Sequence, residues 1–394
     1  MDDIAGLLEI YQPIPDGAPA GSDELWPVTI VVLTLNEERA IARCLDSALA
    51  TSVDRVLVVD TGSTDATVQI VAGYTDQRVE MLQIAWADSF AQARNAALDA
   101  VGEGWAMFLD ADEWIDSDCT DVLRDRLRAF ESVAGITWCA LTPVIREDGR
   151  DAEYREIARI VPADHLRFRG EVHEYPYIPA DADAVPGLIG IDLVLWHDGY
   201  SSEVVVAKDK IQRNVALLES ARRREPDNPR WLFFQLRDAL PMLHFTDVMT
   251  LVEAFDSAKQ QYPGDRQAPE FYRSLALSRA CGRLAQLGEW TTALGLCFDL
   301  DRLTAGEHPD AAYFRGLHEL NKVQQPAPDT LGRLVRLRKD PAAVTLSGLD
   351  KQGRPLDALI AAYLFRLKGR DAANAYLSLC EPWTDEFFDM STLR

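Results

Sequence analysis

The stretch Trp105-Ala106-Met107-Phe108-Leu109-Asp110-Ala111-Asp112-Glu113-Trp114 decides the fold that we predict for this chain. A continuous apolar run, about as long as a buried β-strand, ends there in three carboxylates within four residues. Ligands of open α/β sheets bind at the carboxyl ends of the strands, and carboxylates in that position can hold a hard divalent cation through oxygen. The alternative is a strand followed by the acidic first turn of a helix, since Asp and Glu favour helix N-termini. The residues that precede the stretch favour the ligand site.

Strand and helix patterns alternate upstream of this stretch, with short connections. Apolar runs rich in β-branched residues predict strands at 28–35, 56–59 and 79–84. Apolar residues at helical spacing follow each run and predict three helices: 38–49, a helix from Ser63 or Thr64 as N-cap to Val71, and 89–101. Two further strands, antiparallel or at an edge, are expected at 135–144 and 156–161. The pattern predicts a doubly wound, mostly parallel α/β sheet covered by helices on both faces.

Changes in residue composition and periodicity along the sequence divide the chain into three parts. Residues 1–26 carry closely spaced proline and glycine and are predicted to be an N-terminal arm. Residues 27–204 are predicted to form the α/β domain, and residues 205–394, where strand-like runs disappear, an all-α domain. Three residue pairs recur there 40 residues apart, each opening an aromatic-rich helix: Asn228-Pro229, Ala268-Pro269 and His308-Pro309. This period predicts a helical-repeat module similar to tetratricopeptide repeats, and a plain helical bundle is the alternative.

The composition restricts the classes of partner. A formal net charge of -23 over 394 residues argues against nucleic acid and anionic membrane surfaces, both of which require basic patches. The six cysteines are scattered without CxxC pairing, which predicts free thiols in a reducing compartment. No secretory signal follows the initial Met-Asp-Asp-Ile, and no segment approaches the ~20 apolar residues of a membrane span. We therefore expect a cytoplasmic protein.

Three neighbouring strand ends are short and polar: 34–37, 60–63 and 110–112. The carboxyl ends of parallel strands face one crevice, so these loops should meet. Asp60 can accept a hydrogen bond from the imide N–H of a nucleotide base, and Gly62 allows the chain to approach a ligand closely. The sequence has no G-x-G-x-x-G and no Walker A loop, so a metal ion on Asp112 is the simplest way to hold phosphates.

Segments between residues 28 and 114 follow one another in a family-specific order: VVLTLNEERAIARCLDSAL, VLVVDTGSTDATVQI, FAQARNAAL and WAMFLDADEWI. In this order they resemble the catalytic domain of glycosyltransferase family 2, which has the GT-A fold. Two later segments, 167–174 and 196–200, resemble the subgroup that carries helical repeats behind this domain and includes peptide S-glycosyltransferases of the glycocin type. The resemblance covers the chain well to residue 200 and the repeats only loosely.

The resemblance implies a set of donor-binding residues at the strand ends and on the third helix. They are Leu33, Thr34 and Glu37 lining the nucleotide site, Asp60 reading the base, Arg94 near the diphosphate or sugar, Asp110 at ribose or sugar hydroxyls, and Gly62, Ser63 and Ala111 from the same loops.

The resemblance also implies a metal site and directs the search for a catalytic base. Asp112 would bind Mn²⁺ or Mg²⁺, with His197 as a second ligand. Inversion at an anomeric carbon requires a base for the acceptor proton, and Glu174 is the candidate, with His173 as second choice or acceptor orienter. The structural alternatives are that Arg94 pairs with surface acids and that His197 is a core histidine.

The leading hypothesis is a metal-dependent, inverting glycosyltransferase. It would move a sugar from a nucleoside-diphosphate sugar, preferably a UDP-sugar, to a Cys or Ser side chain of a peptide or protein. The helices would bind this polypeptide or form a homodimer. The alternatives are a transferase with a saccharide acceptor, a non-catalytic scaffold with a helical protein-binding module, and a nucleotidyltransferase, which the missing glycine-rich loop disfavours.

Overall fold

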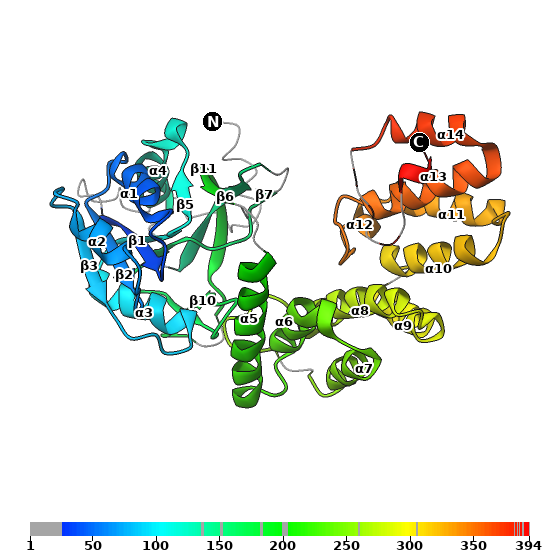
Figure 1. Cartoon of the computed structure of the whole chain (residues 1–394), viewed down its shortest axis with the longest axis horizontal. Coiled ribbons are helices and arrows are strands. Elements are labelled where there is room, and N and C mark those ends of the chain that lie inside the picture. Colours follow the sequence, from blue (N-terminus) through cyan, green and yellow to red (C-terminus); the bar gives the residue numbers. More distant parts are fainter. Residues whose placement is uncertain are drawn as a thin grey trace. The chain divides into compact units, whose positions relative to one another are not determined.

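The computed structural model describes residues 26–134, 138–149, 153–181, 184–198, 204–258, 261–304 and 306–381, together with 383, 385, 387 and 390–393. The predicted arm at 1–26 lies outside these residues, apart from Trp26. The chain forms two compact units (Figure 1). The first runs to Lys210 and also includes Tyr262–Arg266, and the second comprises Ile211–Gln261 and Gln267–Arg394.

A mixed sheet forms the centre of the first unit. Its strands are β1 (Val28–Thr34), β2 (Arg55–Asp60), β3 (Val79–Gln83), β4 (Trp105–Asp110), β5 (Glu113–Ile115), β6 (Cys139–Glu147), β7 (Glu153–Tyr154), β8 (Ile160–Pro162) and β11 (Gly187–His197). In space the order is β3-β2-β1-β4-β8-β6-β11-β5, with β7 beside β6. The first four of these are parallel, whereas β8 is antiparallel to β4 and β6, and β5 is antiparallel to β11. A separate antiparallel pair consists of β9 (Arg167–Arg169) and β10 (Tyr175–Tyr177).

Helices cover both faces of this sheet: α1 (Ile41–Leu49), α2 (Thr67–Ala72), α3 (Phe90–Val101) and α4 (Val122–Ala134). Side chains alternate across each strand, so Ile30 and Val32 pack with α1 and α4, while Val31 packs with Ala97 and Leu98 of α3. These strand residues are fully buried, which explains why the strands read as continuous apolar runs. The predicted doubly wound, mostly parallel α/β fold is confirmed.

One local prediction is wrong. The second helix begins at Thr67 instead of following an N-cap at Ser63 or Thr64, because the Ser63 hydroxyl accepts the N–H of Asn36 at 2.9 Å. The alternative for the acidic residues after β4, the first turn of a helix, does not hold. Glu113 enters the short strand β5, which pairs with the end of β11. This second strand brings the acidic stretch and His197 into register.

Helices make up the second unit, as predicted, with the long helix α5 (Val204–Arg224) leading into it. They are α6 (Pro229–Ala239), α7 (Phe245–Ala254), α8 (Pro269–Gln286), α9 (Trp290–Arg302), α10 (Pro309–Lys322), α11 (Pro328–Arg338), α12 (Pro341–Val344), α13 (Arg354–Lys368) and α14 (Arg370–Leu377). The three prolines spaced 40 residues apart stand in the first turns of α6, α8 and α10. Proline fits there because the first N–H groups of a helix have no partner within the helix. One apolar core runs through these helices.

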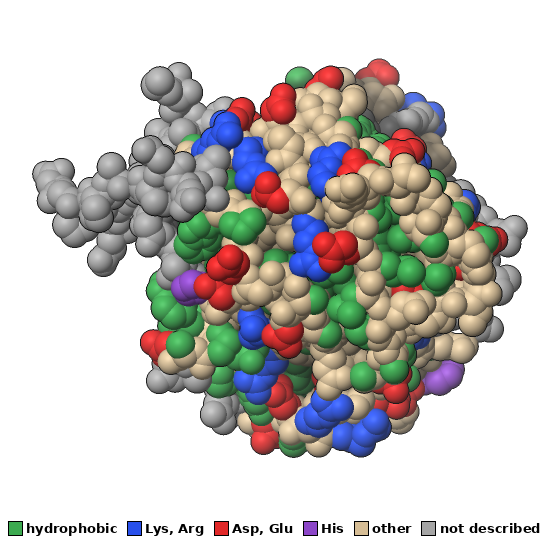
Figure 2. Space-filling view, turned by 90° about the vertical axis from the view of Figure 1, so that its left-hand side faces the viewer, with side chains coloured by type: hydrophobic (Ala, Val, Ile, Leu, Met, Phe, Trp, Pro, Cys, Tyr) green, Lys and Arg blue, Asp and Glu red, His purple; other side chains and the backbone are tan. Residues whose placement is uncertain are grey.

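The surface carries both signs of charge despite the strongly acidic composition. On the face shown in Figure 2, Lys and Arg side chains (blue) lie beside Asp and Glu (red). The six cysteines, all of them among the described residues, form no disulfide bonds with one another, and five of them are buried. No helix among the described residues has the length and apolar character that crossing a membrane requires.

Candidate functional site

The carboxyl ends of β1, β2 and β4 lie side by side, as predicted. In the strand register Thr34 lies beside Asp60, and Leu33 lies beside Asp110. Leu33 is half-buried and Thr34 is buried. The Thr34 hydroxyl has no hydrogen-bond partner among the residues that the structure describes. One edge of the sheet therefore collects polar groups from three strands.

The loop after β1 is fixed to the loop after β2. Asn36 has a left-handed φ of 55°, and its side-chain oxygen accepts a hydrogen bond from the N–H of Thr64 at 2.7 Å. The N–H of Asn36 donates to the hydroxyl of Ser63, and the N–H of Glu37 donates to the hydroxyl of Thr67 at 2.8 Å. Glu37 and Ser63, two of the predicted donor-binding residues, therefore belong to one pair of interlocked loops.

Asp60 is turned toward its own loop. Its carboxylate accepts hydrogen bonds from the backbone N–H groups of Gly62 and Ser63, both at 3.2 Å, and the residue is 2% exposed. Gly62 has a φ of 116°, a conformation that side-chain-bearing residues rarely adopt. Asp60 thus shapes the turn in this structure, and its role in reading a base stays a prediction.

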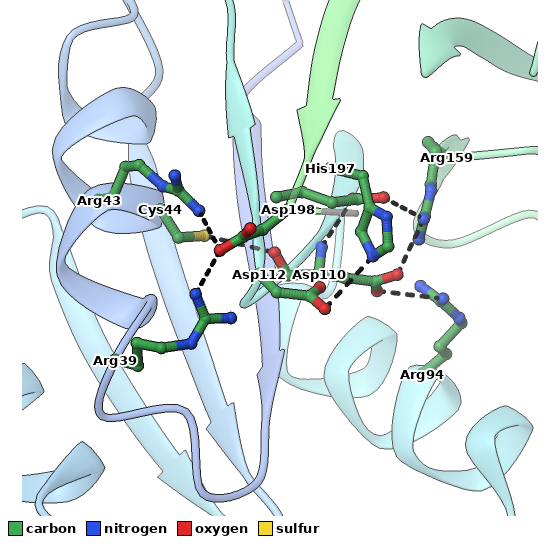
Figure 3. Close-up of polar contacts among 10 residues, drawn as sticks. Arg39, Arg43, Cys44, Arg94, Asp110, Asp112, Arg159, His197 and Asp198 are labelled. Carbon is green, nitrogen blue, oxygen red and sulfur yellow. Dashed lines mark hydrogen bonds and ion pairs between the residues drawn. The ribbon is translucent and has the colours of Figure 1, made fainter. Parts of the chain in front are cut away.

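The Asp110 carboxylate lies between two arginine side chains (Figure 3). Its Oδ2 accepts a hydrogen bond from Nη2 of Arg159 at 2.8 Å, and its Oδ1 lies 3.7 Å from Nη2 of Arg94. Burial alone would raise the pKa of Asp110, but the guanidinium groups of Arg159 and Arg94 outweigh burial and lower it. The carboxylate is therefore ionised at neutral pH. Its side chain keeps 39% of its surface exposed, so it can still accept a ligand hydroxyl.

Glu113 and Arg159 close a ring around Asp110. The same Nη2 of Arg159 donates to Oε1 of Glu113 at 2.7 Å, while Oε2 of Glu113 accepts the backbone N–H of Asp110 at 3.0 Å. The Glu113 side chain is 2% exposed and that of Arg159 is 6% exposed. Burial raises the pKa of Glu113 to about 7; Arg159 opposes the rise and the charge of Asp110 adds to it. The ring holds both the backbone and the side chain of Asp110.

Arg94 joins Asp110 to the predicted base, Glu174. Nε of Arg94 donates to Oε1 of Glu174 at 2.6 Å, and both side chains are largely buried. The guanidinium carbon lies 4.7 Å from the ring centroid of Phe108 and 5.4 Å from that of Phe168. Nη1 of Arg94 is buried and has no hydrogen-bond partner within the described part of the chain. Arg94 therefore pairs with carboxylates of the site and not with surface acids.

The segment that carries Glu174 is held against α3. The side chain of Asn95 accepts the N–H of Phe168 at 2.8 Å and donates to the carbonyl of Phe168 at 2.9 Å. The carbonyl of Glu171 accepts the first N–H group of α3 at 2.8 Å. His173, the second candidate base, follows in a left-handed conformation with a φ of 52° and is half-buried.

The two predicted metal ligands face one another. Oδ2 of Asp112 lies 3.3 Å from Nε2 of His197, whose side chain is 26% exposed (Figure 3). The hydrogen bond to Asp112 raises the pKa of His197, and burial opposes this rise. A carboxylate and an imidazole fit Mn²⁺ or Mg²⁺ if substrate oxygens complete the coordination. Three or more His, Cys, Asp or Glu side chains arranged to hold a metal ion do not occur together in the described residues.

Asp198 ties the end of β11 to α1. Its Oδ2 accepts hydrogen bonds from Nη1 of Arg39 and, at 3.0 Å, from Nη2 of Arg43. The backbone N–H of Asp198 donates to the carbonyl of Asp112 at 3.0 Å. Because Asp198 directly follows His197, these contacts fix the backbone from which the imidazole reaches Asp112.

Several of these residues are absent from the sequence-based prediction. Arg159 carries one signal, since a charged residue inside an apolar strand-like run indicates a buried, charged partner. Asn95 follows Arg94 directly, but no sequence pattern separates it from a solvent-exposed asparagine. Arg39 and Asp198 are 159 positions apart, and no local pattern pairs them.

Comparison with known proteins finds similarity in the segment that forms this site. Residues 29–170 match the family model described as Glycosyl transferase family 2. The SPbeta prophage-derived glycosyltransferase SunS of Bacillus subtilis (strain 168) is 30% identical over 222 residues, which cover 56% of this chain and 50% of that protein. A TPR repeat-containing protein of Synechococcus elongatus is 31% identical over 150 residues, 37% of this chain and 34% of that protein. The chain therefore spans half or less of the length of these relatives.

A solved structure of S. aureus TarS, residues 1–349, is also similar. It is 14% identical, with 86% of this chain and 91% of that chain covered, at a TM-score of 0.35. Likeness at this level supports no inference about ligands.

Proposed function

Because residues 29–170 match the model of glycosyl transferase family 2, we propose that this protein transfers a sugar from a nucleoside-diphosphate sugar, preferably a UDP-sugar. One observation carries the proposal: Asp110, Asp112 and His197 converge with the unpaired nitrogen of Arg94 at one edge of the sheet. This combination offers acceptors for sugar hydroxyls, oxygen and nitrogen ligands for a cation, and a buried positive charge for a diphosphate.

The nucleotide would lie along the ends of β1 and β2. The unpaired hydroxyl of Thr34 offers a hydrogen bond there, and Asp60 is the nearest carboxylate along the strand register. A uracil imide N–H requires an acceptor, which the Asp60 carboxylate supplies. The interlocked loops that contain Glu37 and Ser63 would close around the base and ribose.

Asp112 and His197 would hold Mn²⁺ or Mg²⁺. The ion, when bound, would neutralise the negative charge that develops on the departing diphosphate. Asp198 keeps the backbone of His197 in place, so the imidazole continues to face Asp112. Asp110, ionised between two arginines, would accept hydrogen bonds from hydroxyls of the ribose or the sugar.

Inversion requires a base on the face of the anomeric carbon opposite the leaving diphosphate. Glu174 is our candidate, because its ion pair with Arg94 connects it directly to the donor-binding residues. His173, on the same loop, would orient the acceptor. A thiol acceptor has a pKa of ~8.5 and would need only a weak base, so a cysteine side chain is compatible with a carboxylate that is already in an ion pair.

The acceptor would be a polypeptide bound by the helical unit. Stacked helix pairs form extended concave surfaces that suit peptides and proteins. Two large apolar side chains are strongly exposed there, Phe298 at 61% and Leu379 at 84%. The net charge of -23 would attract basic peptides and repel acidic ones. A second copy of this chain is the other occupant that these side chains could serve.

The test of the proposed activity is incubation of the purified protein with a panel of nucleotide sugars and Mn²⁺. Slow release of nucleoside diphosphate is expected, with its loss in Asp112→Asn and in excess chelator, because one charged ligand is removed with little change of shape. Asp125→Asn, an exposed carboxylate on α4, is the control and should hydrolyse donor normally. Formation of sugar 1-phosphate and nucleoside triphosphate after addition of pyrophosphate would indicate a nucleotidyltransferase, and binding without turnover would indicate a scaffold. Normal hydrolysis in Asp112→Asn would refute the metal role.

The acceptor is tested by replacing Phe298 and Leu379 with serine. We expect donor hydrolysis to persist in these variants while transfer to a peptide falls, because hydrolysis needs only the first unit. If both activities survive and the variants change the size of the protein in solution, the helices serve self-association instead.

A further inference from the structure

Arg159 is more completely enclosed than Arg94, the other buried arginine of the site, with 6% and 8% of their side chains exposed. Arg159 directly precedes β8. Its backbone N–H donates to the carbonyl of Leu141 at 3.1 Å, and its carbonyl accepts the N–H of Phe108 at 2.7 Å. The backbone of Arg159 is thus fixed between β4 and β6. Its guanidinium therefore approaches Asp110 from a backbone that both neighbouring strands anchor.

The guanidinium serves two carboxylates with one nitrogen. Nη2 donates to Asp110 at 2.8 Å and to Glu113 at 2.7 Å, and Glu113 in turn accepts the backbone N–H of Asp110. This closed ring restricts the rotation of the Asp110 side chain and also occupies its backbone N–H. Charge-assisted hydrogen bonds of this kind are the strongest that protein side chains form.

The ring is one end of a longer alternation of charges. From β5 to the loop after β9 the order is Glu113, Arg159, Asp110, Arg94 and Glu174, a carboxylate and a guanidinium in turn. Figure 3 shows the middle of this series, with Asp110 between Arg159 and Arg94. Each arginine lies between two acids, so a displacement of Arg159 leaves Asp110 facing Arg94 alone. Arg94 would then be drawn from Glu174 toward Asp110.

We propose that Arg159 is a positioning residue for the donor: by fixing Asp110 between two guanidinium groups, it keeps Asp110 in place for a sugar-nucleotide hydroxyl and keeps Arg94 paired with Glu174. This inference rests on the proposed transferase function and names a residue that acts through Asp110, without itself touching the donor. Its side chain is 6% exposed, which is consistent with that indirect role.

The test separates orientation from charge. In Arg159→Met the carboxylates of Asp110 and Glu113 lose their shared cation, so the protein should melt at a lower temperature or fail to fold. The double variant Arg159→Met/Glu113→Gln removes the cation together with one of the two carboxyl groups that face it, so folding should largely recover. Arg159→Lys keeps the charge on a side chain that is one bond shorter.

The measurement is donor affinity by calorimetry, at a temperature well below the melting transition of each variant. We expect the double variant to bind the nucleotide sugar roughly tenfold to hundredfold more weakly than the wild-type protein does, as after loss of a charged hydrogen bond. The affinity of Arg159→Lys should lie between those of the wild-type protein and the double variant. The control is Arg55→Met/Glu80→Gln, which removes an Arg–Glu pair at the other end of the same sheet (2.7 Å) and should bind normally. Wild-type affinity in either folded Arg159 variant would overturn the inference. Failure of the wild-type protein to bind any nucleotide sugar would refute the proposed function, and the inference with it.

Discussion

Replacing Asn95 with alanine should destabilise the first unit, because Asn95 holds β9 as a neighbouring strand would. Its amide accepts the N–H of Phe168 at 2.8 Å and donates to the carbonyl of Phe168 at 2.9 Å. On the other side of β9, the residue opposite Phe168 is Pro176, which has no N–H group to donate. Phe168 is 4% exposed, so water has little access to the groups that the substitution leaves unpaired.

The size of the effect follows from these two bonds. Leaving a buried backbone N–H or carbonyl without a partner costs about 1–3 kcal/mol, so the two groups together correspond to about 2–6 kcal/mol. Alanine has a higher helix propensity than asparagine, and this gain on α3 offsets roughly 0.5 kcal/mol of the loss. The expected net loss in the free energy of unfolding is about 3–4 kcal/mol, from the middle of this range.

Urea denaturation followed by tryptophan fluorescence measures this loss by linear extrapolation. The matched control is Gln92→Ala on the same helix, since Gln92 is exposed. An exposed substitution of this kind should stay within about 0.5 kcal/mol of the wild-type protein. If Asn95→Ala and Gln92→Ala were equally stable, the two hydrogen bonds would not hold β9, and the argument that α3 positions the Glu174 loop would fail with them.

Two further predictions concern the helical unit and the end of β11. Gly282→Ala places a methyl group 2.6 Å from the ring of Phe387, so thermal unfolding should show a loss of about 1–3 kcal/mol in the free energy of unfolding. In the control Gly295→Ala the methyl group meets no atom within 4 Å, so the free energy of unfolding should rise by about 0.5–1 kcal/mol. Equal melting temperatures for the two variants would contradict the packing of the C-terminal segment on α8. Asp198→Asn should weaken Mn²⁺ binding about tenfold in calorimetry, because it loosens the backbone that presents the imidazole, while Asp192→Asn on the same strand should not. Unchanged Mn²⁺ affinity in Asp198→Asn would mean that its arginine contacts serve stability alone.

The sequence by itself determined the elements whose cause is local. The alternation of apolar strands with amphipathic helices from residue 28 to 110 is visible because side-chain periodicity depends on neighbouring residues only. The starts of α6, α8 and α10 are visible for the same reason, since proline in the first turn needs no distant partner. The meeting of the three strand ends also followed from the sequence, because parallel strands have their carboxyl ends at one edge.

Only the tertiary structure decided which charges pair at that edge. Asp110 and Arg159 are 49 positions apart, and Arg94 and Glu174 are 80 apart. A carboxylate at a strand end has the same local signature whether it faces a metal ion, a ligand or an arginine, and only the folded chain brings the candidates within 3–4 Å of one another. The antiparallel insertion of β8 between β4 and β6 sets the place of Arg159, and strand order depends on side-chain packing across the whole sheet. The elements are therefore a local property of this sequence, whereas the electrostatic environment of each site residue is a property of the assembled fold.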